Sequence, residues 1–340
     1  MRDALEDARG QVAVLLGVAP RQVVFTSGGT EAINAAVWGA TRAAPGSPVL
    51  AAAVEHSAVR DASARLAPTE TVPVDASGRL DVHALATRLD SNAQPRPGLV
   101  HCQWANHEVG TIQPVHEVVA LCRERGITVH VDAAAACGHI PTDLGDLDAD
   151  LVSVSAHKLG GVPGAGALVV RRGSRFEPLV VGGAQERGRR GGLEGIPVLL
   201  AFGAAAGVLG GDASHVMNEE AAAAACHVAR IVDVACDSEG VAVVGPADPH
   251  LRLPHLVCLG VEGVEAEPVL IGLDRAGVAV HSGSACSSES IEPSPVLEAM
   301  GADPSHSLRV SVGWTTTDED CDAFGKAFAR VVEDLRALRR

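Results

Sequence analysis

The sequence predicts an α/β fold, with a mostly parallel sheet in a large domain and a smaller α+β domain on the C-terminal side. Two patterns carry this prediction. Short β-rich runs alternate with segments of helical periodicity over the first 212 residues, which is typical of βαβ units. Beyond that point an Ala-rich helix leads into further short β-rich runs. We therefore expect residues 1–212 to form the large domain and residues 213–340 the small one.

The chain opens on a helix, a strand and a glycine turn. Apolar residues recur at helical spacing over residues 2–16, and Gly17 supplies the stop. Residues 22–26 predict a short strand that ends in Ser27-Gly-Gly-Thr30, with a helix over residues 31–39. Glycines between a strand and a helix N-terminus leave backbone N–H groups free, so this turn predicts an anion site.

The remaining elements follow from the same patterns. β-rich runs cover residues 48–54, 99–104, 127–132, 151–155 and 167–170, and Gly126 closes a helix over 115–125. Later elements are helices over 195–211 and 219–234 and β-rich runs over 256–259, 278–281 and 308–312. The last helix begins at a capping-box-like Thr316-x-x-Glu319. Its predicted apolar face consists of Cys321, Phe324, Phe328, Val331, Leu335 and Leu338.

Composition narrows the classes of function. The 340 residues are 47% hydrophobic and 20% charged, as in a soluble globular protein, and the net charge of -15 argues against a nucleic-acid partner. The eight cysteines form no Cys-x-x-Cys pair, which indicates neither a zinc site nor a disulfide framework and fits a reducing cytoplasm. Residues 195–211 are too short and too rich in Gly and Ala for a comfortable bilayer span, and the N-terminus has no secretory segment. We therefore expect a cytoplasmic protein without a membrane or metal partner.

The run Ser153-Val-Ser-Ala-His-Lys-Leu-Gly-Gly161 sets Lys158 beside a histidine and a serine at the end of a predicted strand. A lysine there can hold an aldehyde cofactor as a Schiff base if its amine loses its proton near neutral pH. That loss requires burial or a nearby positive charge. The alternative is a surface lysine in a turn, which is the commoner situation for a lysine taken alone.

Six motifs follow one another along the chain: Thr26-Ser-Gly-Gly-Thr-Glu31, Glu55-His56, Asn106-His-Glu-Val-Gly110, His130-Val-Asp-Ala133, Ser155-Ala-His-Lys158 and Ser282-Gly-Ser-Ala-Cys286. Together they closely resemble the cysteine desulfurases of the class V aminotransferase group, and the resemblance runs from about residue 3 to residue 335. The last motif is similar to that of the NifS/IscS-like desulfurases. The resemblance implies the pyridoxal-phosphate-dependent transferase fold of the aspartate aminotransferase type, and a homodimer.

The resemblance assigns most of these residues to pyridoxal phosphate. Lys158 would be the covalent attachment point and the base that moves the substrate Cα proton. Asp132 would pair with the pyridine nitrogen, so that the ring acts as an electron sink. His56 would stack on the ring face and relay protons. The phosphate would be held by Gly29, Thr30, Ser155 and His157.

Two of these residues also have ordinary structural interpretations. An aspartate at the end of a strand, such as Asp132, is commonly a helix N-cap. A lone histidine at a strand end, such as His56, is more often a structural residue whose hydrogen bonds are satisfied. Only the joint spacing of the motifs favours the cofactor roles.

Substrate and sulfur would be handled by Arg309 and Cys286. Arg309, in Leu308-Arg-Val-Ser-Val-Gly313, would grip the carboxylate of L-cysteine with its planar guanidinium. Cys286 lies in the Gly/Ser-rich residues 282–290, whose composition suits a mobile loop, and would take the substrate sulfur as a persulfide, leaving L-alanine. An unidentified acceptor protein would then take the sulfur. The other seven cysteines fit small buried residues better.

Four features depart from the family pattern. Relatives usually begin several tens of residues earlier, with a strand that carries an Asn-Ala-Ala-Thr-Thr-like motif. His107 and Ala135 stand where an asparagine and a glutamine usually contact the cofactor's phenolic oxygen, so we expect the His107 imidazole to act as the substitute donor. Leu193 stands where relatives place a threonine that reaches the neighbouring subunit's phosphate, and Arg189 and Arg190 are expected to replace it in part.

Two alternatives remain open. One is a class V enzyme that needs no nucleophilic cysteine, such as a selenocysteine lyase or an aminotransferase, and Cys286 in its matching motif argues against it. The other is a truncated, non-catalytic paralogue that binds partners. The missing N-terminal strand and Leu193 favour that interpretation. Against it, a non-catalytic protein would have little reason to keep together Lys158, Asp132, Cys286 and Arg309.

Overall fold

The computed structural model describes residues 1–91, 94–211, 214–282 and 293–338, which fall into two compact units. The first, called the large unit below, comprises Met1–Pro73, Leu80–Ala105 and Gln113–Asn218. The second, the small unit, comprises Val74–Arg79, Asn106–Ile112 and Glu219–Arg340. Segments 74–79 and 106–112 thus belong to the small unit, although both come before residue 212, where the sequence places the end of the large domain.

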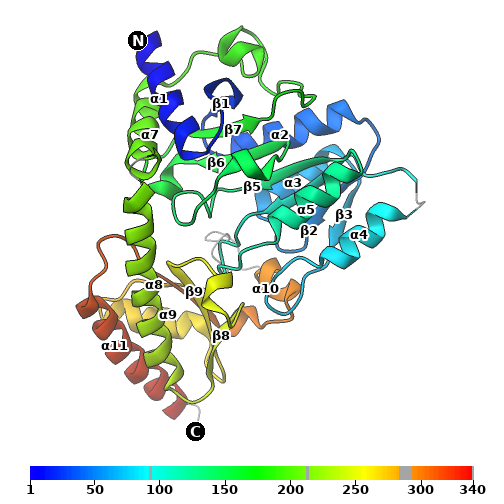
Figure 1. Cartoon of the computed structure of the whole chain (residues 1–340). Coiled ribbons are helices and arrows are strands. Elements are labelled where there is room, and N and C mark those ends of the chain that lie inside the picture. Colours follow the sequence, from blue (N-terminus) through cyan, green and yellow to red (C-terminus); the bar gives the residue numbers. More distant parts are fainter. Residues whose placement is uncertain (92–93, 212–213, 283–292, 339–340) are drawn as a thin grey trace. The chain divides into compact units, whose positions relative to one another are not determined.

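The large unit contains a seven-stranded sheet with the order β1-β7-β6-β5-β4-β2-β3 (Figure 1). Strands β6, β5, β4, β2 and β3 run parallel to one another, whereas β7 is antiparallel to both β6 and β1. The predicted mostly parallel sheet is thereby confirmed. The strands are β1 (Val23–Thr26), β2 (Val49–Ala52), β3 (Thr69–Val72), β4 (Leu99–Gln103), β5 (Thr128–Asp132), β6 (Leu151–Ser155) and β7 (Gly166–Val170).

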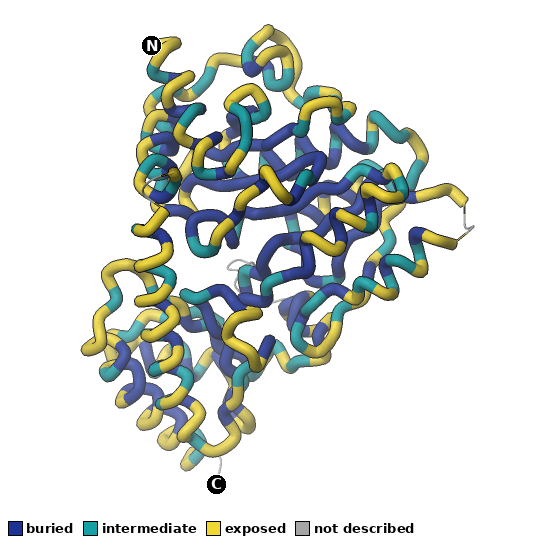
Figure 2. Tube along the Cα trace, viewed as in Figure 1, coloured by how far each residue is buried: buried dark blue, intermediate teal, exposed yellow. Residues whose placement is uncertain are grey.

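The helices of the large unit bury an alanine-rich surface against this sheet. Ala32, Ala36 and Ala40 of α2 pack on Leu151 and Leu168 of β6 and β7, where small side chains allow the helix to approach closely. Figure 2 shows the central strands buried along nearly their whole length. The helices are α1 (Arg2–Leu15), α2 (Gly29–Ala43), α3 (Ser57–Leu66), α4 (Val82–Asp90), α5 (Val115–Glu124), α6 (Leu144–Leu147) and α7 (Ile196–Leu209).

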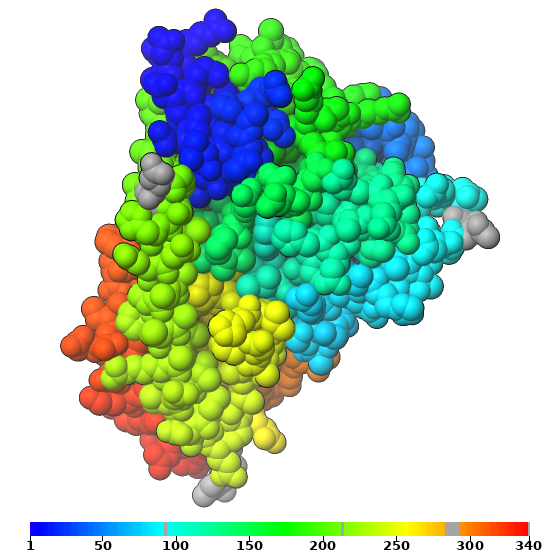
Figure 3. Space-filling view, in the orientation of Figure 1, coloured from blue at the N-terminus to red at the C-terminus, as the bar shows by residue number. Residues whose placement is uncertain are grey.

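Helix α1 ends where the sequence predicts and lies directly on α7. Gly17 has a φ of 64°, a left-handed conformation that glycine adopts without strain. A Cβ on Gly203 of α7 would lie 2.6 Å from the Cα of Ala8, so only glycine permits this helix contact. Figure 3 shows the surfaces of the two segments adjoining, in blue and green. The packing of α7 thus supports a core helix over residues 196–209.

Membrane-spanning potential is confined to one bent pair of helices in the described part of the chain. No single helix there is both long and apolar enough to cross a bilayer. Helices α7 and α8 (Ser214–Cys236) meet the length and composition test only when counted together, across a bend of 78°.

The small unit contains a four-stranded antiparallel sheet with the order β10-β11-β9-β8. Its core joins strand residues such as Val257 and Leu308 to Phe324 and Phe328 of the last helix. Full burial of each phenylalanine contributes about 1.5–3 kcal/mol. The elements are β8 (Val241–Val244), β9 (Leu256–Val261), β10 (His281–Ser282), β11 (Ser307–Ser311), α9 (Ala266–Arg275), α10 (Pro295–Ala299) and α11 (Asp318–Ala337), together with most of α8.

Three predicted details of the small unit are wrong. The capping box of α11 is formed by Thr317 and Asp320, because the Thr316 hydroxyl instead accepts from the backbone N–H of Gly313. Leu338 is 83% exposed and lies beyond the buried face of the helix. Residues 278–280 form no strand, and pairing with β11 starts only at His281.

Candidate functional site

The site begins at one edge of the large sheet. Strands β2, β4, β5 and β6 are parallel, so their carboxyl ends lie at the same edge, where α/β proteins place functional groups. Asp132 ends β5, Ser155 ends β6, and Glu55-His56 follows β2. β1 also ends at this edge, because Thr26 and Ser155 are both paired with Gly166 of β7. We call this set of strand ends the site edge.

Asp132 is the buried carboxylate of the site edge. Only 8% of the residue is exposed. Its Oδ1 atom accepts hydrogen bonds from the Ser153 hydroxyl at 2.9 Å and from the backbone N–H of Ala134 at 3.1 Å. The second contact is the local capping geometry expected of an aspartate after a strand. The first is tertiary, because Ser153 is the residue paired with Asp132 across β5 and β6.

The glycine turn after β1 forms a cradle against the end of β6. Gly28 is the N-cap residue of α2 and makes no side-chain hydrogen bond, so it leaves the first N–H groups of this 15-residue helix without a cap from the N-cap side chain. A Cβ on Gly29 would lie 3.2 Å from the Cβ of Ser155. The Ser155 hydroxyl in turn lies 2.9 Å from Nδ1 of His157. Gly29, Ser155 and His157 are therefore brought together, with Thr30 exposed in the first turn of α2.

Lys158 follows β6 in a short 3-10 helix, Ala156–Leu159. The Lys158 backbone carbonyl accepts from Nε2 of His139 at 2.8 Å, which fixes the turn. Burial, together with the Lys158 charge, lowers the pKa of both His157 and His139, so these imidazoles are uncharged near neutral pH. Lys158 itself is exposed, so burial is not the environment that the structure provides for it.

His56 caps the N-terminus of α3. Its Nδ1 atom accepts from the backbone N–H of Ala58 at 3.0 Å, so a neutral His56 carries its proton on Nε2. The preceding Glu55 accepts from the backbone N–H of Gln103 at 2.7 Å, and Gln103 is paired with Asp132. His56 thus belongs to the site edge, two strands away from Asp132, and its structural interpretation as a cap also holds.

His107 and Arg309 meet in the small unit. The Nη1 atom of Arg309 donates to the backbone carbonyl of His107 at 3.1 Å. The His107 Nε2 atom lies 3.4 Å from a carboxylate oxygen of Glu108, and Glu108 accepts from the Ser294 hydroxyl. Arg309 is therefore oriented by the backbone of the residue that the sequence singled out as unusual.

The loop around Leu193 is tied to the N-terminal elements of the large unit. Glu186 forms a buried two-pronged ion pair with Arg9, with N–O distances of 2.6 and 2.7 Å, and also accepts from the backbone N–H of Phe25. Arg190 pairs with Glu31 at 2.9 Å, and Arg189 donates to the carbonyl of Arg21. Both arginines expected to replace the missing threonine thus have partners within the chain, while Leu193 is 85% exposed.

The cysteines divide by burial. Cys286 lies outside the described residues. Burial raises the pKa of Cys122, Cys137 and Cys258 to about 12, which makes these thiols inert. The expectation that the other seven are buried is wrong for Cys226 and Cys236, which lie on exposed positions of α8.

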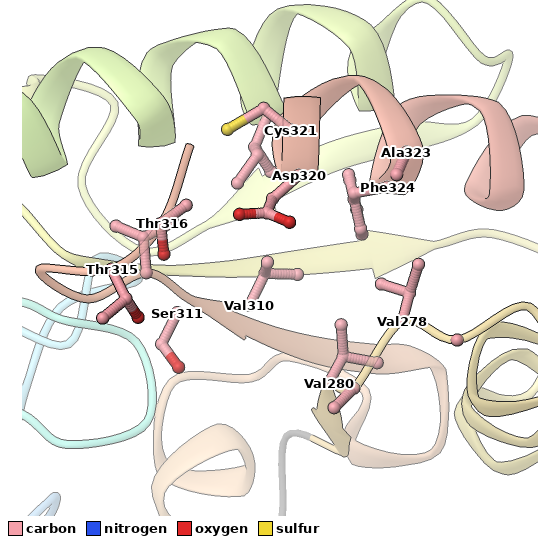
Figure 4. A pocket seen from close by; sticks show the side chains of 14 residues that line it. Val278, Val280, Val310, Ser311, Thr315, Thr316, Asp320, Cys321, Ala323 and Phe324 are labelled. Atoms are coloured by element: carbon pink, nitrogen blue, oxygen red, sulfur yellow. The ribbon is translucent and has the colours of Figure 1, made fainter. Parts of the chain in front are cut away.

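A pocket of about 230 Å³ lies in the small unit, and none of the described residues that the sequence predicts for the site is among its lining residues (Figure 4). It lies between β11 and the start of α11, and Val310, Asp320 and Phe324 are among its lining residues. Cys321 also lines it, but burial raises the pKa of this thiol. The pocket therefore supplies no activated nucleophile.

Four polar residues near the site were missed by sequence reasoning: His101, His130, His139 and Ser153. Two of them carry a signal that could have been used. His130 lies two positions before Asp132 on β5, and Ser153 lies two positions before Ser155 on β6. Residues two positions apart on a strand face the same side, so each lies on the same face as a predicted site residue. His101 and His139 are linked to the site only by tertiary contacts.

Comparison with known proteins identifies the family. The class-V aminotransferase family model matches residues 1–324. A cysteine desulfurase from Gluconacetobacter diazotrophicus is 38% identical, over 98% of this chain and 84% of the relative. Among solved structures, a NifS-like protein has a TM-score of 0.87 at 28% identity and covers 99% of this chain and 88% of that one. The structure of SspA in complex with cysteine has a TM-score of 0.74 at 26% identity, covering 92% and 87%. The chain therefore belongs to the class-V aminotransferase family, among its cysteine desulfurases.

Proposed function

We propose that this chain removes sulfur from L-cysteine with pyridoxal phosphate held at the site edge of the large unit. The observation that carries the proposal is the meeting of two kinds of partner at one sheet edge. Asp132 offers a buried carboxylate for a ring nitrogen, and the N-terminus of α2 with Ser155 offers donors for a phosphate. Pyridoxal phosphate needs both at once.

The donor set of the site fits this cofactor. The first N–H groups of α2 carry partial positive charge and receive no side-chain cap from the N-cap residue Gly28, which favours a phosphate. Glycine at position 29 leaves the turn open beside Ser155, where a side chain would intrude. Thr30 and His157 add a hydroxyl and an imidazole. When bound there, pyridoxal phosphate supplies an electron sink for the bonds at the substrate Cα.

Three residues of the site edge would hold or transfer protons and orient the cofactor ring. Asp132 would accept the N–H of the ring nitrogen and keep that nitrogen protonated. Lys158 would be the covalent attachment point and, once displaced by substrate, the base that moves the Cα proton. His56, which accepts from the backbone N–H of Ala58 through Nδ1, would cover the ring face and relay protons.

The substrate would be held from the small unit. Arg309 would bind the carboxylate of L-cysteine through its planar guanidinium, which the His107 carbonyl orients. The His107 imidazole would donate to the phenolic oxygen of the cofactor. The similarity to SspA, whose structure is in complex with cysteine, supports this choice of substrate.

Cys286 would receive the sulfur. Its thiolate would attack the substrate sulfur, so that an S–S bond forms while the Cβ–S bond breaks. The electron pair of the broken bond passes to the substrate side, where Cβ takes up a proton and becomes the methyl group of L-alanine. No external oxidant is needed, because the persulfide holds the oxidised sulfur until an acceptor protein takes it.

The proposal includes a homodimer in a reducing cytoplasm. Val181 and Leu193 are 76% and 85% exposed on the loop where relatives reach the neighbouring subunit, as expected of apolar side chains that a second copy covers. A reducing compartment would maintain the seven described cysteines as free thiols. Sedimentation at micromolar concentration tests the dimer, and a single species of 34.7 kDa would contradict it.

The decisive experiment measures L-alanine and sulfide released from L-cysteine in the presence of pyridoxal phosphate and a reductant. Lys158→Ala should lose both products and the visible absorbance of the bound cofactor. Cys286→Ala should keep the absorbance and lose both products. The matched control is Cys226→Ala, an exposed thiol on α8, which should behave as wild type.

Two results would contradict the proposal separately. If wild-type protein develops no visible absorbance with pyridoxal phosphate, the cofactor assignment is wrong. If Cys286→Ala forms L-alanine as fast as wild type, sulfur transfer to Cys286 is wrong while the cofactor assignment stands.

A further inference from the structure

Four polar side chains of the large unit form a buried series that ends at Asp132. Ser153 Oγ lies 2.9 Å from Asp132 Oδ1, and His130 Nε2 lies 3.2 Å from Ser153 Oγ. The Nδ1 atoms of His130 and His101 are 2.8 Å apart. Strand register builds the series, because His101 of β4 is paired with His130 of β5, and Asp132 is paired with Ser153 of β6.

The hydrogen bonds place every proton of the series once Asp132 is ionised. The single Ser153 proton is donated to Asp132, so the hydroxyl accepts from His130 and the proton of His130 is on Nε2. A neutral His130 then presents a lone pair at Nδ1, which accepts from Nδ1–H of His101. His101 Nε2 is left as a lone pair. These positions are assigned from the network.

Donation in the reverse direction, from Asp132 toward His101, would be higher in free energy. It requires a protonated Asp132, and it leaves an N–H at His101 Nε2. That atom is buried and has no hydrogen-bond partner among the described residues. An orphaned buried N–H is rarer in proteins than an acceptor with an unused lone pair.

Burial keeps both imidazoles uncharged. It lowers the pKa of His130 to about 4, although the Asp132 charge opposes that shift. It also lowers the pKa of His101 well below its usual value, and His130 adds to the effect. Among the described residues no three His, Cys, Asp or Glu side chains converge as metal ligands would, so the pair forms no metal site there.

We propose that His101, His130 and Ser153 are positioning residues, which donate in one direction toward Asp132 and orient its carboxylate. The inference rests on the proposed function, since an oriented carboxylate serves the ring nitrogen of pyridoxal phosphate. Ser153 and Ala134 both donate to Oδ1, so the ring nitrogen would be held by Oδ2. Because the donors are neutral, they orient Asp132 without the competing positive charge that an arginine or lysine would bring.

The direction of donation is tested on the full chain without cofactor. Long-range proton–nitrogen NMR at pH 7 distinguishes the two neutral tautomers of each histidine, with signals assigned from His101→Phe and His130→Gln variants. The expected spectrum shows His130 protonated at Nε2 and His101 protonated at Nδ1. A His130 ring protonated at Nδ1 would overturn the proposal, and so would a doubly protonated ring.

The effect on Asp132 is tested with two buried serines. Ser153→Ala removes the link, and we expect about tenfold weaker binding of pyridoxal phosphate, equivalent to about 1.4 kcal/mol, together with loss of the single His130 tautomer. The matched control is Ser63→Ala, because Ser63 is equally buried and its hydroxyl has no partner among the described residues. Ser153→Thr retains the hydroxyl and should restore both readouts.

The outcomes separate this proposal from the proposed function. Equal cofactor affinity in Ser153→Ala and Ser63→Ala would overturn the positioning role even if wild type is fully active. If wild type fails to bind pyridoxal phosphate, the proposed function fails, while the tautomers still decide the direction of donation. If Ser153→Ala does not fold, the proposal is tested by the histidine tautomers in the wild-type spectrum and by the cofactor affinity and His130 tautomer of Ser153→Thr.

Discussion

The two units hold their functional side chains by different physical means. In the large unit, the Asp132 carboxylate accepts from the Ser153 hydroxyl on the neighbouring strand, and His130 in turn lies within hydrogen-bond distance of Ser153. The two donors are uncharged, and all three residues are buried. In the small unit, Arg309 is held by the backbone carbonyl of His107, beside the carboxylate of Glu108. Uncharged donors in strand register give direction without burying further charge, whereas a guanidinium gives attraction for an anion. The difference suits the proposed roles, in which the large unit would keep a cofactor in place and the small unit would bind the substrate carboxylate.

The largest effect on activity is expected from removing the negative charge of Asp132 in the large unit. Asp132→Asn keeps the shape of the side chain but removes the charge that would keep the ring nitrogen protonated. We expect kcat for L-alanine formation to fall about 10³-fold, within the range for a lost proton-handling group. Steady-state kinetics measure it, with Asp90→Asn at an exposed ion pair as the control. A fall of less than tenfold would mean that Asp132 does not control the ring nitrogen.

A smaller effect is expected from the guanidinium of the small unit. Arg309→Ala should raise KM for L-cysteine by roughly 10–100-fold, the value of one or two charge-assisted hydrogen bonds, and change kcat much less. Arg309→Lys should recover only part of this, since an ammonium lacks the planar fork. Arg275→Ala in the last turn of α9 is the control. An unchanged KM in Arg309→Ala would place the substrate carboxylate elsewhere.

The smallest effect concerns the stability of the buried histidines in acid. The folded-state pKa of His130 is about 4, below the usual value of 6.5, so the unfolded chain binds the proton more readily. Stability is therefore full above pH 6.5 and falls as the pH drops from 6.5 toward 4, by about 1.4 kcal/mol at pH 5.5 from His130 alone. His101 contributes in the same direction.

Urea denaturation at pH 7.5 and 5.5 measures this loss. His130→Gln should reduce the difference between the two pH values, whereas His83→Gln on the exposed side of α4 should leave it unchanged. Equal losses in wild type and His130→Gln would show that His130 is not the buried group that titrates.

Much of the site edge could be predicted from the sequence because its residues mark the ends of local patterns. Asp132 and Ser155 each close a run of buried strand residues, and the glycines after Thr26 mark the next helix start. The sequence patterns did not predict an element that lacks an apolar run of this kind. β3 (Thr69–Val72) has three of its four residues partly or fully exposed, so it offers no apolar run to recognise.

The sequence by itself determined the order of the elements and the chemical type of residue at each strand end, because periodicity and turn residues act over a few positions. Only the tertiary structure decided which side chains are neighbours. His101 and His130 are 29 residues apart, and His130 and Ser153 are 23 apart. Strand register, set by the packing of the whole sheet, brings them into hydrogen-bond distance. The direction of donation toward Asp132 then depends on all four partners at once, which no local pattern can specify.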